Sequence, residues 1–352
     1  MQANRVSTLP RFLARFPRLA LALLACAALP TSGCYYAHLA HGQARILLAR
    51  QSIADMLAAN GTSPELAERL RLAGAVRKFA AGLGLDVGAQ YTSYVDWPGD
   101  RVVTSVVATR PGEIEARGFW FPLVGRVPYK GYFDQDRAES EAAHLASEGL
   151  DTCLVPVVAY STLGWMADPL TAPLARSPRL AETLIHELVH ATVFEASEPD
   201  FNEGLATFVG QEGVIRFVAA RDGDGEAARE RTRVAEDRRV AGVLEAFRDA
   251  VASLYATTEP GTVRGERRAA LEASTREELR ALPLATRDSE ALGRDIRLND
   301  ACQALIGTYQ GDLPRYEAVL EALGGDLGRF VELARKAARE SDPRAALLAP
   351  PG

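Results

Sequence analysis

The spacing of apolar residues predicts helices at both ends of the chain and a strand-rich segment between them. Apolar positions recur at helical intervals in residues 36–60 and again from Pro64 through VRKFAAGLGL, where Ser63-Pro64 is typical of a helix start. From residue 91 the pattern changes to RVVTSVVAT and GFWFPLVGRV, which are rich in β-branched and aromatic residues and are interrupted by glycine and proline. A small β-sheet is therefore expected after the first helices.

Helical spacing returns after this segment and continues almost to the end of the chain. Residues 136–149 predict a helix, DTCLVPVVAYST predicts a largely buried strand, and HELVH and FNEGLATF lie in two further helical segments. The charged residues 222–240 indicate a solvated helix face or a loop. The remaining predicted helices are 240–255, 264–281, 295–309, 313–323 and 327–340, followed by a tail at 344–352 that we expect to be flexible. Together these elements predict an α+β fold that is predominantly helical.

The beginning of the chain predicts a secretory signal. Four arginines precede LALALLACAAL, an apolar run that is short for a membrane span, and a cysteine follows in TSGC. We therefore expect a signal peptide of the lipoprotein type over residues 1–33, with a lipid attached to Cys34 that anchors the protein to a membrane. An ordinary signal peptide cleaved nearby is the alternative. The expected location is the cell envelope, and Tyr35 after the cysteine favours the outer membrane, facing the periplasm.

Removal of the signal peptide makes the chain more acidic. The full chain has a net charge of −6, and the residues after position 33 hold 36 basic and 46 acidic side chains, a net charge of −10. This balance argues against nucleic acid as a partner. Cys153 and Cys302 could pair in an oxidising compartment or remain as buried thiols. We expect one domain over residues 34–343, made of N-terminal helices 36–84, a sheet region 91–163, central helices 177–220 and a helical C-terminal lobe 224–340.

The motif HELVH carries the clearest chemical signal in the chain. His186 and His190 are four residues apart, so on a helix their imidazoles lie on one face and can reach the same ion. Apolar residues flank the two histidines, which would therefore point inward and need a partner. Glu187 lies beside the first histidine, where it can take a proton from a metal-bound water.

A third ligand is predicted in the following helical segment. Glu203 lies in FNEGLATF, and two histidines on one helix with a glutamate on the next form the His2Glu set of catalytic zinc sites. One Zn²⁺ per chain is expected. The other histidines, His38, His41 and His144, are interpreted as surface or structural residues. Asn202 and Thr207 flank Glu203 and are candidates for supporting it by hydrogen bonds.

Several motifs in combination resemble one protein family. YKGYF, AYSTLGWMADP, HELVH and FNEGLATFVGQEG are similar to motifs of the bacterial lipoproteins described as putative zinc aminopeptidases, and the similarity runs over nearly the whole chain after the signal peptide. The resemblance implies a zincin-like (gluzincin-like) metallopeptidase fold. It also implies zinc at His186, His190 and Glu203, with Glu187 as the catalytic base, and a peptide as the substrate.

The expected reaction is peptide-bond hydrolysis, and a hydroxyl donor for the developing oxyanion is needed. Tyr160 is the first candidate because its segment precedes the metal helix, and Tyr129, Tyr132 and Tyr309 are alternatives. An aminopeptidase must also bind the free α-ammonium group of its substrate, for which Asp168 is a candidate, although a turn role suits it better. A zinc endopeptidase with the same ligands, or a non-catalytic lipoprotein that binds an envelope partner, are the alternative functions.

Overall fold

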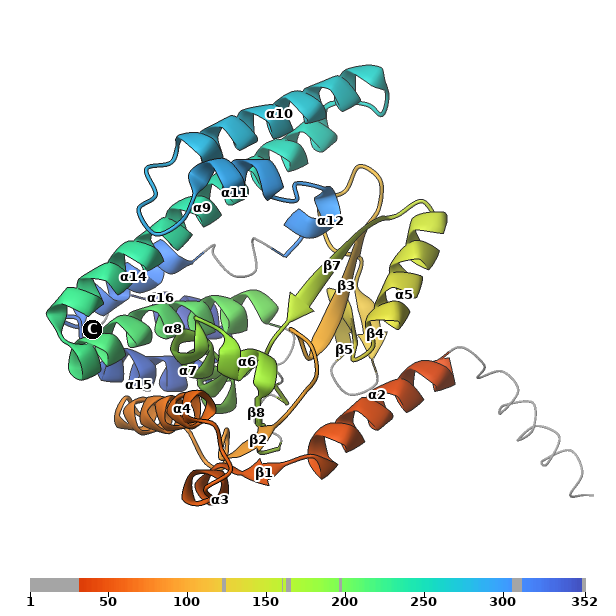
Figure 1. The fold of residues 1–352 in the computed structure, drawn as a ribbon. Helices are drawn as coiled ribbons and strands as arrows, with labels where there is room; N and C mark the ends of the chain where they lie inside the picture. Colours follow the sequence, from red (N-terminus) through yellow and green to blue (C-terminus); the bar gives the residue numbers. More distant parts are fainter. Residues whose placement is uncertain are drawn as a thin grey trace, which may run out of the picture. The chain divides into compact units, whose positions relative to one another are not determined.

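The structure is a computed structural model that describes residues 32–121, 125–159, 161–162, 166–195, 198–305 and 312–349 (Figure 1). The chain separates into two compact units, Met1–Leu48 and Ala49–Gly352. In the first unit the described residues form helix α2 (Ser32–Leu48), and most of the predicted signal peptide lies outside the described residues. Among the described helices, none combines the length and the apolar character needed to cross a membrane. The fold is α+β and mostly helical, with small sheets.

The helix predicted over residues 36–60 is interrupted, so this prediction is wrong in part. After α2 the chain forms strand β1 (Gln51–Ser52) and then helix α3 (Ile53–Ala58), whose first turn is capped by the Ser52 hydroxyl accepting from Asp55 N at 3.3 Å. Strand β1 pairs with a strand that is distant in the sequence, and such a pairing leaves no trace in local periodicity. Helix α4 (Pro64–Gly82) begins as predicted, because Ser63 Oγ accepts from the backbone N–H of its first turn.

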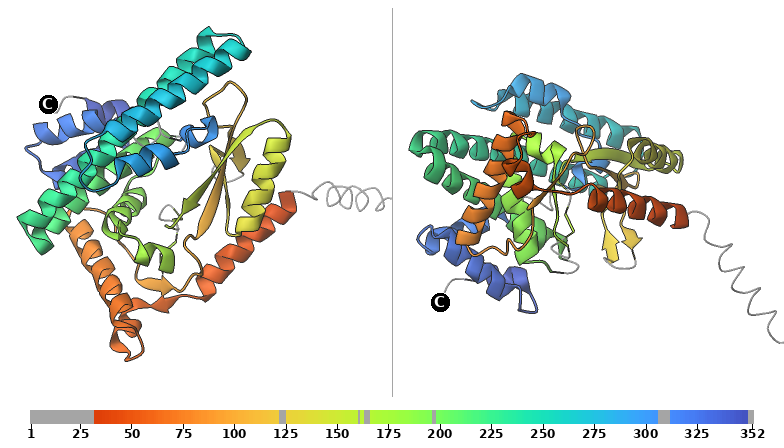
Figure 2. Two further views of the ribbon diagram at one scale, coloured as in Figure 1. Left: turned by 45° about the horizontal axis from the view of Figure 1, so that its top comes forward. Right: turned by 60° about the horizontal axis from the view of Figure 1, so that its bottom comes forward.

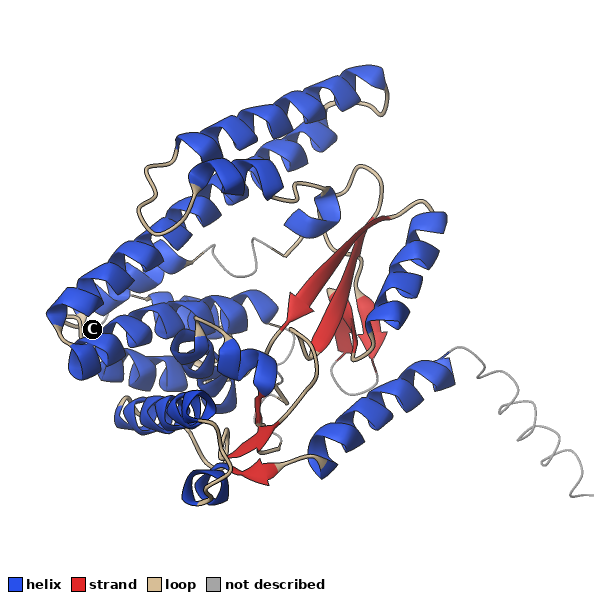
Figure 3. Ribbon diagram, viewed as in Figure 1, coloured by secondary structure: helices blue, strands red, loops and turns tan. Residues whose placement is uncertain are grey.

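The described strands form three small sheets with the orders β1-β2-β8, β6-β3-β7 and β4-β5 (Figure 3). Their bounds after β1 are β2 (Ser93–Val95), β3 (Val103–Thr109), β4 (Phe119–Phe121), β5 (Gly125–Val127), β6 (Tyr129–Tyr132), β7 (Asp151–Val157) and β8 (Leu170–Thr171). Strand β3 is central and runs antiparallel to both β6 and β7. It is buried along almost its whole length, which explains why its sequence is a continuous run of small and β-branched residues.

Helix α5 (Gln135–Ser147) covers one face of the β6-β3-β7 sheet. It begins where Asp134 accepts from the backbone N–H of Arg137 at 3.0 Å, and Lys130 of β6 pairs with its Glu141 at 2.9 Å. Helix α7 (Leu180–Thr192), which carries HELVH, and helix α8 (Pro199–Asp222), which carries Glu203, lie on the side of the sheet away from α5 (Figures 1 and 2). The remaining helices are α6 (Ala172–Arg176), α9 (Asp224–Thr257), α10 (Thr262–Ala281), α11 (Ser289–Asp295), α12 (Asp300–Gln303), α14 (Leu313–Ala322), α15 (Leu327–Ala337) and α16 (Pro343–Leu348).

The largest apolar core surrounds α7 and α8. It includes the buried face of α4 and aromatic side chains from α8, α14 and α15. The rings of Phe208, Tyr316 and Phe330 contact one another with centroids 5.1 to 6.1 Å apart. The two helices that carry the metal motif are thus among the most deeply packed elements of the described structure.

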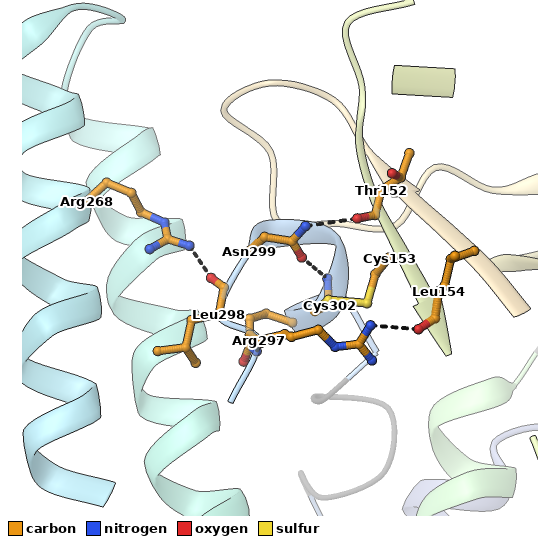
Figure 4. Close-up of a disulfide and its surroundings, with 9 residues drawn as sticks. Thr152, Cys153, Leu154, Arg268, Arg297, Leu298, Asn299 and Cys302 are labelled. Carbon is orange, nitrogen blue, oxygen red and sulfur yellow. Dashed lines mark hydrogen bonds between the residues drawn. A yellow bond between two sulfur atoms is a disulfide. The ribbon is translucent and has the colours of Figure 1, made fainter. Parts of the chain in front are cut away.

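A disulfide joins the sheet to the helical C-terminal region. Cys153 in β7 is bonded to Cys302 in α12, which decides between the two alternatives that the sequence leaves open (Figure 4). Asn299 and Arg297 donate to the carbonyl groups of the β7 residues on either side of Cys153, at 2.9 Å each. The short helix α12 is therefore held on the sheet by one covalent bond and two hydrogen bonds, on the face that α5 leaves open.

Two C-terminal predictions differ from the structure, and one open alternative is decided. From Asp224 onward the charged residues belong to the long helix α9, so the helix face is correct and the loop is not, and ion pairs such as Arg233 with Asp237 stabilise this charged helix. The helix predicted over 295–309 is wrong in its first part, since α11 ends at Asp295 and α12 starts anew with Asn299 as its cap. The tail predicted from residue 344 contains α16, which Asp342 caps and whose Leu347 is fully buried.

Candidate metal centre

The two histidines of HELVH lie one turn apart on α7, as their spacing predicts. The apolar residues around them, including Leu184 and Leu188, are fully buried and fix the orientation of the helix. His186 and His190 consequently project from one face, and their Nε2 atoms are 3.2 Å apart. His190 is only 4% exposed, whereas His186 lies nearer the surface.

Glu203 on α8 completes the group. Its Oε2 lies 3.3 Å from His186 Nε2 and 3.6 Å from His190 Nε2, and the three ligand atoms all lie within 4.8 Å of one another. The side chain of Glu203 is 24% exposed, so solvent reaches the centre from the side of His186 and Glu203. The three predicted ligands therefore converge on one point. The centre is buried on the side of His190 and accessible to solvent on the side of His186 and Glu203.

Glycines on α8 allow this close approach of the two helices. A Cβ atom on Gly210 would lie 3.2 Å from the carbonyl oxygen of Glu182 and 3.4 Å from His186 Cβ, and one on Gly213 would lie 3.1 Å from Ile185. Larger residues at these two positions would push α8 away from α7. Because the ligands come from different helices, the separation of the helices decides whether Glu203 can reach the histidines.

The charges of the centre are strongly coupled. Burial alone would raise the pKa of Glu203, but hydrogen bonds with His186 and His190 outweigh burial and hold this pKa well below its usual range. Burial alone would lower the pKa of His186, and its hydrogen bond to Glu203 together with the negative charges of Glu187 and Glu203 raises it instead. The carboxylate is therefore kept ionised in a largely buried place, as a metal ligand must be.

The donor set fits a divalent cation. A proton can join only one pair of the three converging atoms at a time, whereas a cation accepts a lone pair from all three at once. Two imidazole nitrogens and one carboxylate oxygen are the ligands that zinc takes in catalytic sites, where a fourth position stays open. The exposed side of His186 and Glu203 is where such a position would lie.

Asn202 and Thr207, which were predicted to support Glu203, have surroundings that differ from each other. Asn202 is buried, and its side chain accepts from Glu195 N at 2.8 Å and donates to Glu195 O at 2.7 Å. It thereby ties the segment that follows α7 to the start of α8, next to the ligand. Thr207 is half-buried one turn after Glu203. The hydrogen bonds of Asn202 thus fix the backbone at the start of α8, one residue before Glu203.

Asp168 is sequestered in the structure. It is 2% exposed, and its two carboxylate oxygens accept from Thr162 N at 2.9 Å and from the Thr162 hydroxyl at 2.8 Å. Burial, and to a smaller degree the charge of Glu187, raises the pKa of Asp168 to about 6 despite the two Thr162 hydrogen bonds. These contacts favour the turn role over the binding of a substrate ammonium group.

Tyr91 is a residue near Glu187 that the sequence did not suggest. It is buried, and it is the only non-glycine residue with positive φ, 56°, among those the structure describes. Its backbone N–H donates to the carbonyl oxygen of Asp168 at 2.7 Å, and Gln90 accepts from Asp168 N. Burial, then the charges of Glu187 and Asp168, raises the pKa of Tyr91 well above its usual range. No local sequence signal marks a tyrosine in this conformation.

Two of the four tyrosines named as candidate hydroxyl donors lie in the part of the chain that the structure describes. Tyr160, the first candidate, and Tyr309 lie outside the described residues. Tyr129 and Tyr132 both belong to β6, and burial, followed by the negative charges of Glu203 and Glu187, raises the pKa of Tyr129 to about 12. The side chain of Cys34, in α2, is also outside the described atoms.

Fold and site together define an α+β protein with a candidate His2Glu metal centre between two packed helices. Residues 34–348 match a protein family described as "Putative aminopeptidase", and the chain belongs to this family. The membership supports a peptidase-like function. No curated protein and no solved structure matches the chain.

Proposed function

We propose that this protein is a zinc-dependent peptidase with a zincin-like arrangement, and specifically an aminopeptidase. The observation that carries the proposal is the convergence of His186, His190 and Glu203 within 4.8 Å, with Glu187 adjacent to the first ligand. A purely structural metal site has no need of a glutamate in this place, whereas hydrolysis needs a base there. Family membership supports the aminopeptidase assignment.

The side chains have distinct tasks in the proposed mechanism. His186, His190 and Glu203 would hold the metal, which would lower the pKa of a bound water molecule towards neutrality. Glu187 accepts a proton from the attacking water and later delivers it to the leaving amine. Asn202 and the glycine contacts of α8 keep the ligand carboxylate in reach of the histidines.

The first test is metal content and turnover. The purified soluble domain should hold about one zinc per chain, should lose hydrolysis of peptides on chelation, and should regain it when zinc is restored. Glu187→Gln should keep the metal and lower kcat by about 1,000-fold, since a positioned general base contributes roughly 100- to 10,000-fold. Glu182→Gln is the matched control, because Glu182 lies on the same helix but pairs with Arg233. An empty site, or full activity in Glu187→Gln, would contradict the proposal.

An endopeptidase is the second candidate because of what the structure shows at Asp168. That carboxylate is buried and engaged by Thr162, so the candidate predicted for the substrate ammonium group is not offered to a ligand. Peptides with free N-termini should be compared with the same peptides acetylated at the N-terminus. Cleavage of the free peptides alone supports the aminopeptidase, and equal cleavage of both sets supports the endopeptidase.

We also propose that the protein is lipid-anchored in the cell envelope through Cys34, on the outer membrane facing the periplasm. The support is the sequence TSGC after a basic segment and a short apolar run. Labelled palmitate should be incorporated into the full chain and not into the Cys34→Ser variant. Equal labelling of both would exclude the anchor at this residue.

A further inference from the structure

The register of the β6-β3-β7 sheet shows which way the side chain of Tyr129 points. Tyr129 is directly opposite Val107, and Val107 is directly opposite Cys153. Residues opposite one another in antiparallel strands project from the same face. Val107 and Cys153 pack against Ala301 and Ala304 of the α12 region, so Tyr129 also projects from this face, away from α5.

The neighbours of Tyr129 on β6 confirm that successive side chains of this strand project from opposite faces of the sheet. Lys130 pairs with Glu141 of α5 at 2.9 Å and therefore projects from the opposite face. Tyr132 shares the face of Lys130, and the Lys130 ammonium lies 5.6 Å from the centroid of its ring. The side chain of Tyr129 is thus directed away from α5. Helices α7 and α8 lie on that side of the sheet (Figures 1 and 2).

Exposure separates Tyr129 from the other tyrosines that the structure describes within residues 49–349. Tyr129 is 38% exposed, whereas Tyr132 is 6% exposed and has the packing of a core residue. Tyr91, Tyr94 and Tyr316 are buried, and Tyr255 donates to Asp300. Tyr129 thus combines a position on the face of the sheet away from α5 with access to solvent.

Electrostatics relates Tyr129 to the metal centre. Burial of part of the side chain, then the negative charges of Glu203 and Glu187, raises the pKa of Tyr129 to about 12. Its hydroxyl is therefore protonated at neutral pH and can donate a hydrogen bond. The candidate ligand Glu203 is among the causes of the raised pKa of Tyr129 and is not among those given for Tyr91, Tyr94, Tyr255 or Tyr316.

We propose that the Tyr129 hydroxyl donates a hydrogen bond to the oxygen of the scissile carbonyl group as negative charge develops there. This inference rests on the proposed peptidase function. The oxygen of water bonds to the carbonyl carbon while Glu187 takes the proton, and the C–N bond then breaks as that proton passes to the leaving amine. Tyr129 keeps its own proton throughout and acts as a neutral donor whose bond strengthens in the transition state.

The test compares two tyrosines of one strand. Tyr129→Phe should bind zinc as the wild type does and lower kcat by about 100-fold, with KM changed by less than about threefold. Tyr132→Phe removes a hydroxyl from the other face of β6 and should leave both constants near the wild type. Tyr129→His, which restores a donor, should recover part of the lost kcat.

A second readout distinguishes a catalytic from a structural role. A phosphonate analogue of the peptide imitates the charged tetrahedral carbonyl, so its inhibition constant should weaken in Tyr129→Phe by about the same factor as kcat falls. Unchanged kcat and inhibition constant in Tyr129→Phe would overturn the assignment while the peptidase function stands. A zinc-loaded wild type that hydrolyses no peptide would refute the proposed function, and the role of Tyr129 would fall with it.

Discussion

Helices α7 and α8 carry the candidate metal ligands. They are stabilised in a different way from residues 240–305, which we call the outer helical segment. Around α7 and α8 the contacts are mostly apolar, with a continuous core and glycines that bring the helix backbones together. In the outer helical segment the apolar cluster is smaller and centres on Phe247 and Val251 of α9. Ion pairs such as Arg268 with Asp300, together with the Cys153–Cys302 disulfide, supplement it.

This difference relates packing to function. A metal site needs its ligand atoms within fractions of an ångström of fixed positions, and dense apolar packing provides this precision because it leaves side chains no alternative arrangement. Charged pairs on exposed helices have a smaller and more adaptable effect. The outer helical segment can therefore be changed more freely than α7 and α8 without loss of the metal centre, and three experiments examine this conclusion.

The largest effect on the free energy of unfolding is expected for loss of the disulfide. The double variant Cys153→Ser, Cys302→Ser should lower the free energy of unfolding by about 2 to 5 kcal/mol, because the bond closes a loop of 149 residues in the unfolded chain. Limited proteolysis should then cut the outer helical segment first, while zinc binding persists. Reducing agent should destabilise the wild type and leave the double variant unchanged. Loss of zinc in parallel with loss of the disulfide would show that the two regions are not separable.

An intermediate effect is expected for glycine substitutions in the two regions. Gly210→Leu should lower the free energy of unfolding by about 1 to 3 kcal/mol, because its side chain has to enter the contact of α8 with Glu182 and His186. Zinc affinity should fall as well, since Glu203 moves away from the histidines. Denaturant unfolding and competition with a chelator measure the two quantities.

Gly242→Leu is the matched control on α9. A Cβ at Gly242 would have no neighbouring atom within 4 Å, so the same substitution should stabilise the helix by about 0.5 to 1 kcal/mol. Zinc affinity should not change. If both leucine variants behaved alike, close packing of α7 and α8 would not be the reason for the glycine at position 210.

The smallest effect on stability is expected from the change in protonation of two buried carboxyl groups with pH. Asp168 has a pKa of about 6, above its value in the unfolded chain, so the folded state holds the proton more tightly. Its contribution to stability is complete below about pH 4 and is lost as pH rises through about 6. Asp168→Asn should therefore stabilise the protein by roughly 1 to 2 kcal/mol at pH 8 and have no such effect at pH 4.

Glu236 on α9 should respond to pH in the opposite direction. Burial acts to raise its pKa, but the hydroxyl of Thr286 and the backbone N–H groups of Ala285 and Thr286 lower it overall. Its contribution is present above the unfolded pKa and is lost as pH falls through the lower folded value. Thermal unfolding of Glu236→Gln and Asp168→Asn across pH should give slopes of opposite sign relative to the wild type. Slopes of the same sign would contradict the assignment of these two pKa shifts.

The sequence by itself determined the elements whose information is local. The start of α4 follows from Ser63-Pro64, the strand β3 from its β-branched run, and the pairing of His186 with His190 from the pitch of a helix. Each of these depends on residues no more than a few positions apart, where steric preference and side-chain spacing leave few alternatives.

Only the tertiary structure decided the features that depend on contacts between distant segments. The approach of Glu203 to the histidines requires the packing of α7 on α8 through Gly210 and Gly213, and the break after α2 requires the pairing of β1 with β2. The disulfide, the burial of Asp168 and the direction of Tyr129 depend on sheet register and on helices that follow much later in the chain. Local periodicity contains no information on such distances, because they are set by the shape and packing of the whole core.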